Sequence, residues 1–304
     1  MSHAPASEDW ATSRGERWRT HLEGLEAQLA PVNDPLLEAL DLDSAGRIAD
    51  VGCGGGASTL AIAGAVAPGT VVHGFDLSPA LVDAARERIP ADDTSITFAV
   101  ADVGTSPAPR EPYGRLASRF GTMFFADPAS AFANLREWLA PGGRFAFAVW
   151  AGPADNPWLT SPRDAVATVT DTSATEPDAP GPFRYADADI LVALLAEAGF
   201  ANLDIRAWES SLQVGGGLPA AEAARFAIGS SSASAALDDA GDGARRSAVE
   251  LLTETFAEYE RDGVVTMPAH AHIVTGGFSA PRADASGPPA TARPPRGTDR
   301  GRRP

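Results

Sequence analysis

The stretch Ile48-Ala49-Asp50-Val51-Gly52-Cys53-Gly54-Gly55-Gly56 decides the fold. It joins a short apolar run, Arg47 to Val51, to a helical stretch from Ser58 to Val66 through a turn with four glycines in five residues. Strand, tight turn and helix in this order are typical of the first unit of an α/β fold. Glycine permits positive φ angles and carries no Cβ, so the backbone of this turn can pass close to a ligand.

Strand-like and helix-like segments alternate along the rest of the chain, which predicts a doubly wound, mainly parallel sheet with helices on both faces. Including the first, seven strands are expected; the others cover Val71 to Phe75, Ile96 to Val100, Leu116 to Ser118, Arg144 to Trp150, Leu203 to Val214 and Val264 to Thr275. Further helices are expected over Trp10 to Ala30, Asp34 to Leu40, Pro79 to Arg88, Ala129 to Leu139, Asp187 to Ala198, Ala220 to Ile228 and Ala244 to Arg261. Pro141-Gly142-Gly143 predicts a turn before the fifth strand.

Composition shifts divide the chain into four parts. We expect an N-terminal helical cap over 1–45, a cofactor-binding α/β core over 46–150, a substrate loop followed by the C-terminal part of the sheet over 151–278, and a disordered tail over 279–304. Residues 151–182 are rich in Pro, Ala, Asp and Thr and are too long for a plain connection, which favours a lid or substrate loop. The tail is rich in Pro, Gly and Arg and has almost no apolar content.

Charge and composition exclude several classes of protein. The 304 residues are 44% apolar and carry a formal net charge of -16, so the average field repels nucleic acid and anionic lipid. All 24 basic residues are arginine, which excludes Schiff-base catalysis, a Walker phosphate loop and a Tyr/Lys reductase pair. Cys53 is the single cysteine, and neither a long apolar run nor a leader-like start is present. We expect a cytoplasmic monomer or homodimer that acts on a small molecule.

Three acids lie at the ends of successive strands, and their positions predict a nucleoside cofactor. Asp50 lies beside the turn, where a carboxylate opposes a pyrophosphate but suits the cationic amino and sulfonium groups of S-adenosyl-L-methionine. Asp76 ends the second strand and can accept hydrogen bonds from ribose hydroxyls, and Asp102 can accept from an adenine amino group. The turn also satisfies Gly-x-Gly-x-x-Ala through Ala57, so an NAD(P)-dependent oxidoreductase is a competing hypothesis.

The sequence resembles the class I S-adenosylmethionine-dependent methyltransferases, in particular the bacterial branch similar to ubiquinone/menaquinone C-methylases. The matching stretches are Asp50 to Gly56, Gly74 to Pro79, Ala101-Asp102, Ser118 to Phe125, Pro141 to Arg144, Asn156 to Trp158, Pro180 to Phe183 and Ala198 to Phe200. These stretches occur along the chain in the same order as in members of the family. One departure is Gly114 after Tyr113, where family members often carry an acid.

This resemblance implies a Rossmann-like sheet of seven strands with an antiparallel last strand, and methyl transfer to O, N or C of a small metabolite. A methyltransferase-fold protein with a non-transfer activity is a further alternative. The methionine part of the cofactor is expected on the glycine turn, the ribose on the second strand's acid, and the adenine after the third strand. The cofactor-binding residues predicted in this way are Asp50, Gly52, Cys53, Gly54, Gly56, Asp76, Leu77, Asp102, Val103 and Ser118.

Candidates for catalysis and substrate binding come from the fourth strand, the aromatic residues and the first helix. Arg119 could hold a substrate carboxylate or phenolate, although a structural ion pair explains it equally well. His21 is the candidate general base, and its alternative is a plain surface position. The predicted substrate contacts are Trp18, Arg119, Met123, Trp150, Asn156, Trp158 and Phe183. His270 and His272 share a strand face without a third ligand, so no metal site is predicted.

Overall fold

A twisted sheet with the strand order β3-β2-β1-β4-β5-β8-β6 organises the chain. This computed structural model describes residues 6–44, 46–170 and 179–278. The first five strands of the order are parallel, and β8 runs antiparallel to β5 and β6. The seven-stranded sheet with an antiparallel last strand is confirmed, and a two-residue strand, β7, is added beside β8. The strands are β1 (Arg47–Val51), β2 (Val71–Asp76), β3 (Ile96–Val100), β4 (Tyr113–Arg119), β5 (Leu139–Trp150), β6 (Ala201–Gln213), β7 (Glu260–Arg261) and β8 (Val264–Gly277).

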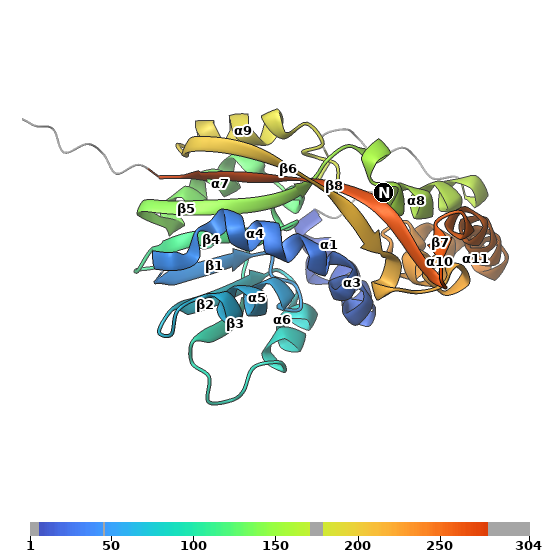
Figure 1. The fold of residues 1–304 in the computed structure, drawn as a ribbon, viewed down its shortest axis with the longest axis horizontal. Helices are drawn as coiled ribbons and strands as arrows, with labels where there is room; N and C mark the ends of the chain where they lie inside the picture. Colours follow the sequence, from blue (N-terminus) through green and yellow to red (C-terminus); the bar gives the residue numbers. More distant parts are fainter. Residues whose placement is uncertain (1–5, 45, 171–178, 279–304) are drawn as a thin grey trace, which may run out of the picture.

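Helices flank the sheet on both faces, and a separate helical cluster lies at one end of the molecule (Figure 1). In that cluster α8, α10 and α11 pack on one another beside the far ends of the long strands β6 and β8. The α-helices are α1 (Ala6–Ala11), α2 (Ser13–Thr20), α3 (Leu22–Leu29), α4 (Asn33–Leu40), α5 (Ala57–Ala65), α6 (Pro79–Arg86), α7 (Pro128–Trp138), α8 (Pro157–Val169), α9 (Ala188–Glu197), α10 (Ala220–Ser230) and α11 (Ser234–Ala257). Within these ranges no helix is long and apolar enough to cross a membrane.

The predicted single helix from Trp10 to Ala30 is wrong, because the chain breaks it at two residues. Thr12 separates α1 from α2 with φ -128° and ψ -108°, and His21 separates α2 from α3 with φ -111° and ψ 16°. Apolar spacing alone predicts a face but does not detect a backbone break inside it. The breaks let Trp10 of α1 lie 5.6 Å, ring centroid to centroid, from Trp18 of α2.

Strand β4 begins at Tyr113, three residues earlier than predicted, and the added part contains a buried arginine. Arg115 is 6% exposed, and its guanidinium donates to the carbonyl oxygens of Leu40 at 2.6 Å and of Asp41 at 2.6 and 2.9 Å, at the end of α4. These carbonyls have no partner within their helix, so the arginine satisfies them and is itself satisfied. The predicted turn at Pro141-Gly142-Gly143 is an irregular start of β5, where the pairing register with β4 shifts.

The region expected as a loop over 151–182 contains helix α8, with Pro157 in its first turn and Pro162 inside it. An internal proline argues against a helix in a sequence pattern, which is why this one was missed. Helix α11 begins ten residues earlier than expected and has a break at Gly241, with φ 85°. The predicted tail over 279–304 lies outside the described residues.

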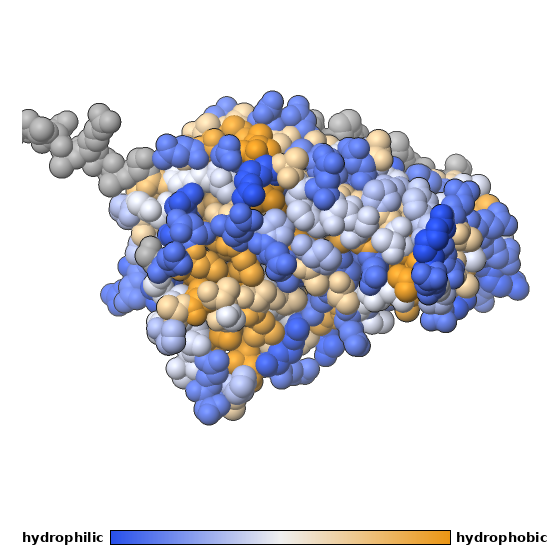
Figure 2. All heavy atoms as spheres, in the orientation of Figure 1, coloured by the Kyte–Doolittle hydropathy of each residue, from blue (hydrophilic) through white to orange (hydrophobic). Residues whose placement is uncertain are grey.

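One large core joins the three folded parts of the chain. Its buried members come from the N-terminal helices, from both faces of the sheet, and from the helical cluster, as with Leu36, Phe147 and Phe256. Figure 2 shows apolar residues gathering near α4 and α5, with hydrophilic residues over much of the rest of that face. Large apolar side chains that are clearly exposed are Val100, Ile190 and Leu251. The boundaries at residues 45 and 150 remain a prediction.

Two close backbone contacts fix the ends of β1 and β4 beside each other. Gly52 has φ +70°, and a Cβ built on it would lie 2.7 Å from the Cα of Gly121. The hydroxyl of Ser118 donates to the carbonyl oxygen of Val51 at 2.7 Å and accepts from the Gly121 N–H at 3.2 Å. Only a glycine fits at position 52, since both its backbone angle and its neighbour exclude a side chain.

Replacing Gly52 with alanine is expected to lower the free energy of unfolding by about 2 kcal/mol or more, from left-handed strain and the backbone clash. The matched control is Gly64→Ala in helix α5, where an added Cβ meets nothing within 4 Å and should raise stability by about 0.5 kcal/mol. Urea unfolding followed by circular dichroism measures both. Equal stabilities of the two variants would contradict the close approach at Gly52.

Candidate functional site

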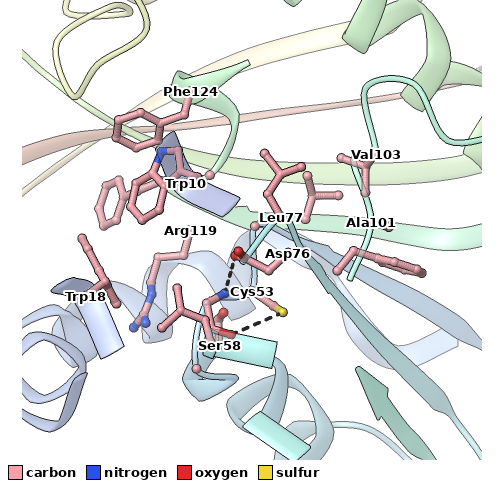
Figure 3. Close-up of a pocket in the computed structure, with 18 of the residues that line it drawn as sticks. Trp10, Trp18, Cys53, Ser58, Asp76, Leu77, Ala101, Val103, Arg119 and Phe124 are labelled. Carbon is pink, nitrogen blue, oxygen red and sulfur yellow. Dashed lines mark hydrogen bonds between the residues drawn. The ribbon is translucent and has the colours of Figure 1, made fainter. Parts of the chain in front are cut away.

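A cavity of about 110 Å³ opens where β1, β2, β3 and β4 end (Figure 3). Its wall is formed by the glycine turn, by the residues that follow β2 and β3, by the end of β4, and by side chains from the N-terminal helices. The lining residues are Trp10, Trp18, Glu26, Leu29, Val51, Gly52, Cys53, Gly54, Gly55, Ser58, Phe75, Asp76, Leu77, Leu81, Ala101, Asp102, Val103, Arg119, Phe120, Gly121, Phe124 and Phe125. In a doubly wound sheet this edge is where ligands bind.

The glycine turn presents backbone without side chains to this cavity. The N–H groups of Gly52 and Cys53 both donate to the carbonyl oxygen of Phe75, at 2.8 and 3.0 Å, which holds the turn against β2. Gly54 has φ +55°, and a Cβ built on it would meet no protein atom within 4 Å. A side chain there would instead take up space that the cavity leaves open for a ligand.

Asp76 is held rigidly at the cavity wall. Its Oδ2 accepts from the Gly54 N–H at 2.8 Å, and its Oδ1 accepts from the Ser78 N–H at 2.9 Å. Burial raises the pKa of this carboxyl, and the two backbone donors oppose the rise. Each carboxylate oxygen has a second lone pair, so Asp76 can still accept two hydroxyl hydrogens from a ligand.

Asp50 lies fully buried under the turn rather than in the cavity lining. Its Oδ2 accepts from the hydroxyls of Ser58 and Thr59, both at 2.7 Å. Its Oδ1 has no hydrogen-bond partner among the described residues. Burial raises the pKa of Asp50, and the two hydroxyls and the Arg119 guanidinium oppose the rise. A buried acceptor without a partner is costly, so a cationic group at the turn would relieve it.

Arg119 points into the first cavity, between Trp18 and Ser58 in Figure 3. Its guanidinium donates to Asn33 Oδ1 at 2.8 Å and to the Leu29 carbonyl oxygen at 3.3 Å. Burial lowers the pKa of Arg119, while Asp50 and Glu26 raise it. The arginine and the acids together give this end of the cavity both signs of charge, as the zwitterionic end of an amino acid requires.

The other predicted cofactor residues lie along the same wall, except Gly56 and Ser118. Leu77, Asp102 and Val103 line the cavity, and Asp102 Oδ1 accepts from the Gly104 N–H at 2.9 Å. Cys53 also lines it, and burial raises the pKa of its thiol well above the usual value. Ser118 is buried outside the lining and joins β4 to β1 as described above.

A second, larger cavity of about 400 Å³ adjoins the first. Trp10, Trp18, Leu29, Phe120 and Phe124 line both cavities, so they form the wall between them. The second cavity extends from there to α8, α10 and the segment that follows residue 178. Its remaining lining residues are Arg14, Leu25, Gln28, Met123, Trp150, Pro153, Trp158, Leu159, Pro162, Arg163, Ala179, Pro180, Gly181, Pro182, Phe183, Arg184, Val214, Phe226, Ala227, Ser230, Ser231 and Ser232.

Five of the seven predicted substrate residues line this second cavity: Trp18, Met123, Trp150, Trp158 and Phe183. Trp150 stacks on Phe120 with ring centroids 3.8 Å apart and meets the edge of Trp158 at 5.1 Å. The face of the cavity is therefore an aromatic wall that suits a flat apolar ligand.

The structure places Asn156 and His21 outside both linings. The Asn156 side chain exchanges two hydrogen bonds with the His270 backbone, at 3.0 and 3.1 Å, and so anchors the start of α8 to β8. His21 Nδ1 lies 3.0 Å from the Arg17 carbonyl oxygen, and its ring packs edge-on against Phe226. His21 faces α10, so the geometry does not support the role of general base.

Sequence reasoning missed several lining residues from the N-terminal helices. Trp10 contacts Trp18 and Phe124, with centroids 5.6 and 5.1 Å apart, as Figure 3 shows. Glu26 lines the first cavity and binds Arg88, whose Nη1 lies 2.7 and 2.8 Å from its carboxylate oxygens. The clustering of tryptophan and arginine from Trp10 to Trp18 was the available signal. Among the described residues no group of three or more metal-ligating side chains is placed to hold an ion.

Comparison with known proteins agrees with this geometry. Residues 48–143 match the family model described as methyltransferase domain. The chain is 29% identical over 118 residues to aklanonic acid methyltransferase DauC of Streptomyces sp. (strain C5), covering 38% of this chain and 54% of that protein. It is 31% identical over 128 residues to demethylmenaquinone methyltransferase of Thermus thermophilus, covering 42% and 51%. The matches therefore span about half the length of these curated relatives.

A solved structure extends the likeness of fold over most of the chain. Phosphoethanolamine N-methyltransferase 2 of Haemonchus contortus, solved in complex with S-adenosyl-L-methionine, superposes with a TM-score of 0.54 over 92% of this chain and 61% of that one, at 15% identity. Residues 48–143 therefore match a methyltransferase domain, and the relatives that match this part of the chain are methyltransferases. The chain as a whole has the Rossmann-like methyltransferase fold, as the resemblance predicted.

Replacing Asp76 with alanine is expected to weaken S-adenosylhomocysteine binding at least about tenfold, since hydrogen bonds to a charged acceptor are lost. Isothermal titration calorimetry measures the dissociation constant. The matched control is Asp83→Ala in the neighbouring helix α6, whose carboxylate is exposed and pairs with Arg86. Unchanged affinity in the Asp76 variant would contradict the assignment of this acid to the cofactor.

The pH dependence of binding follows from the same acids. Burial raises the pKa of both Asp50 and Asp76 above the ordinary carboxyl value of 3.8. Both acids are expected to accept hydrogen bonds as carboxylates, so affinity for S-adenosylhomocysteine is full above the raised pKa values. The affinity falls as the pH is lowered through these two pKa values, and the fall begins above pH 3.8. Calorimetry across this range should show the fall, and Asp76→Asn should flatten it. A constant affinity down to pH 3.8 would contradict the prediction.

Proposed function

We propose that this chain is an S-adenosylmethionine-dependent methyltransferase that acts on a small molecule. The single observation that carries the proposal is the pairing of two cavities across one wall. The first is lined by the glycine turn and by the acids at the ends of β2 and β3, and the second is larger and aromatic. A donor site and an acceptor site that share a wall are what a transfer between two bound molecules requires.

The residues of the first cavity fit S-adenosylmethionine part by part. The turn at Gly54 leaves open the space that a Cβ would fill, and Asp50 Oδ1 is an acceptor without a partner. Asp50 and Arg119 would hold the amino acid end, Asp76 the ribose hydroxyls, and Asp102 with Val103 the adenine. When bound, S-adenosylmethionine supplies a methyl group on a sulfonium that is displaced in line.

The protein's own contribution is to position the acceptor and exclude water. Among the described residues that line the second cavity there is no His, Asp, Glu, Cys or Tyr. None of the described lining side chains is therefore assigned as a general base, and the aromatic wall formed by Trp18, Trp150 and Trp158 serves to orient the acceptor. Alignment of reacting groups in a dry site can supply much of the rate enhancement.

An NAD(P)-dependent oxidoreductase gains no support from these findings. The family match over residues 48–143 and the relatives reported above are methyltransferases. The buried carboxylate of Asp50 lies at the turn where a pyrophosphate would have to bind. The net charge of -16 favours a small-molecule acceptor over nucleic acid, and a cytoplasmic monomer or homodimer remains our proposal for its state.

Calorimetry with three ligands tests the cofactor. S-adenosylmethionine and S-adenosylhomocysteine are expected to bind and to compete with each other, and NAD is expected to bind at least about a hundredfold more weakly, because its diphosphate opposes Asp50. Turnover is then followed as S-adenosylhomocysteine release in the presence of candidate acceptors. Tight binding of NAD without a response to either sulfur nucleoside would reject the proposal.

A further inference from the structure

The charged side chains among the described residues that line the second cavity are all positive. Its described lining residues include Arg14, Arg163 and Arg184 and no acidic residue. The whole chain has 40 acidic and 24 basic residues, so acids would be expected more often than arginines at any surface. A lining with three arginines and no acid therefore favours an anionic ligand.

Arg14 is the lining arginine that we expect to pair with an anionic ligand. It is half-buried on α2, and its guanidinium carbon lies 4.9 Å from the ring centroid of Trp10 and 5.0 Å from that of Phe124. No ion pair or hydrogen bond holds its guanidinium among the described residues. Burial lowers the pKa of Arg14, and only Asp9 opposes that effect. A buried cation is stable in proteins when an anion pairs with it.

The other two arginines are already engaged. Arg184 donates to the carbonyl oxygen of Phe125. Arg163 is half-exposed on α8, and its Nε lies 3.6 Å from Asp164 Oδ1. They contribute positive potential to the cavity, while Arg14 retains its donors for a ligand. Arg119, the arginine expected from the sequence to hold a substrate anion, belongs to the first cavity and is bound to Asn33.

The aromatic side chains of the lining indicate that the uncharged part of the ligand is a flat ring system. Trp10 and Phe124, on which the Arg14 guanidinium lies, also separate the two cavities. Trp150, Trp158 and Phe183 add further apolar surface to the same cavity. A flat ring system against these side chains places an attached anion at the guanidinium, whose planar fork matches a carboxylate.

We propose that the second cavity binds an aromatic carboxylate, with Arg14 as the residue that pairs with its anionic group. This inference rests on the proposed function, because it assigns the acceptor site of the same enzyme. The reacting atom of the acceptor is not specified by it. Arg14 acts as a recognition residue, and it selects an acid over the corresponding neutral amide.

Binding of two matched probes tests the proposal. 2-Naphthoate and its neutral isostere 2-naphthamide are titrated into the full-length protein saturated with S-adenosylhomocysteine, with tryptophan fluorescence and calorimetry as readouts. The acid is expected to bind about tenfold or more tightly than the amide, as for a charge-assisted hydrogen-bonded pair. Arg14→Met should abolish this preference while the amide's affinity stays the same, and Arg14→Lys should restore part of it.

The matched control is Arg17→Met, one turn further along α2, at a half-buried position outside both linings. It should keep the preference for the acid. Equal affinity of the two probes, failure of both to bind, or an unchanged preference in Arg14→Met would overturn the proposal. S-adenosylhomocysteine binding is measured separately on each variant, so failure of the cofactor site is distinguished from failure of the acceptor site.

Discussion

The hydrogen bond from the Gly54 N–H to Asp76 Oδ2, at 2.8 Å, is the constraint on which the site depends. It joins the turn after β1 to the acid at the end of β2, two segments that the parallel pairing of these strands brings to one edge. Gly54 has φ +55°, a left-handed conformation that glycine adopts without the strain of a side chain. The same contact leaves one lone pair on each Asp76 oxygen free for ligand hydroxyls. This one backbone hydrogen bond therefore both joins the two strand ends and positions the acid that faces the ligand.

The charged side chains at the carboxyl ends of the parallel strands are of both signs. Asp50 is a buried acid and Asp76 a half-buried one, both with raised pKa values, and Arg119 lies near them with a lowered pKa. A zwitterionic amino acid end finds partners of both signs there, whereas a diphosphate would meet two carboxylates with one arginine. Among the described residues that line the second cavity, the charged side chains are all arginines. The two sites thus differ in charge although they share a wall, which lets each bind its own ligand without competing for the other's.

Local patterns were sufficient for the sheet and for most of the first cavity. The glycine turn, Asp76 and Asp102 follow strands that periodicity identifies, and parallel strands bring their carboxyl ends together. The second cavity could not be predicted in the same way, since α2, α8 and α10 meet only through tertiary packing. Arg14 and Trp10 were missed because the break at Thr12 sets their direction. Asn156 and His21 are polar residues in suggestive positions whose side chains pack against backbone and α10 instead.

A crystal structure of the protein with S-adenosylhomocysteine tests the central claim most directly. The account predicts ribose hydroxyls on Asp76, adenine beside Asp102 and Val103, the amino acid end between the glycine turn and Arg119, and the sulfur facing the wall formed by Trp18 and Phe124. A first cavity empty of any adenosyl compound at saturating ligand, or a glycine turn wrapped around a phosphate, would contradict it.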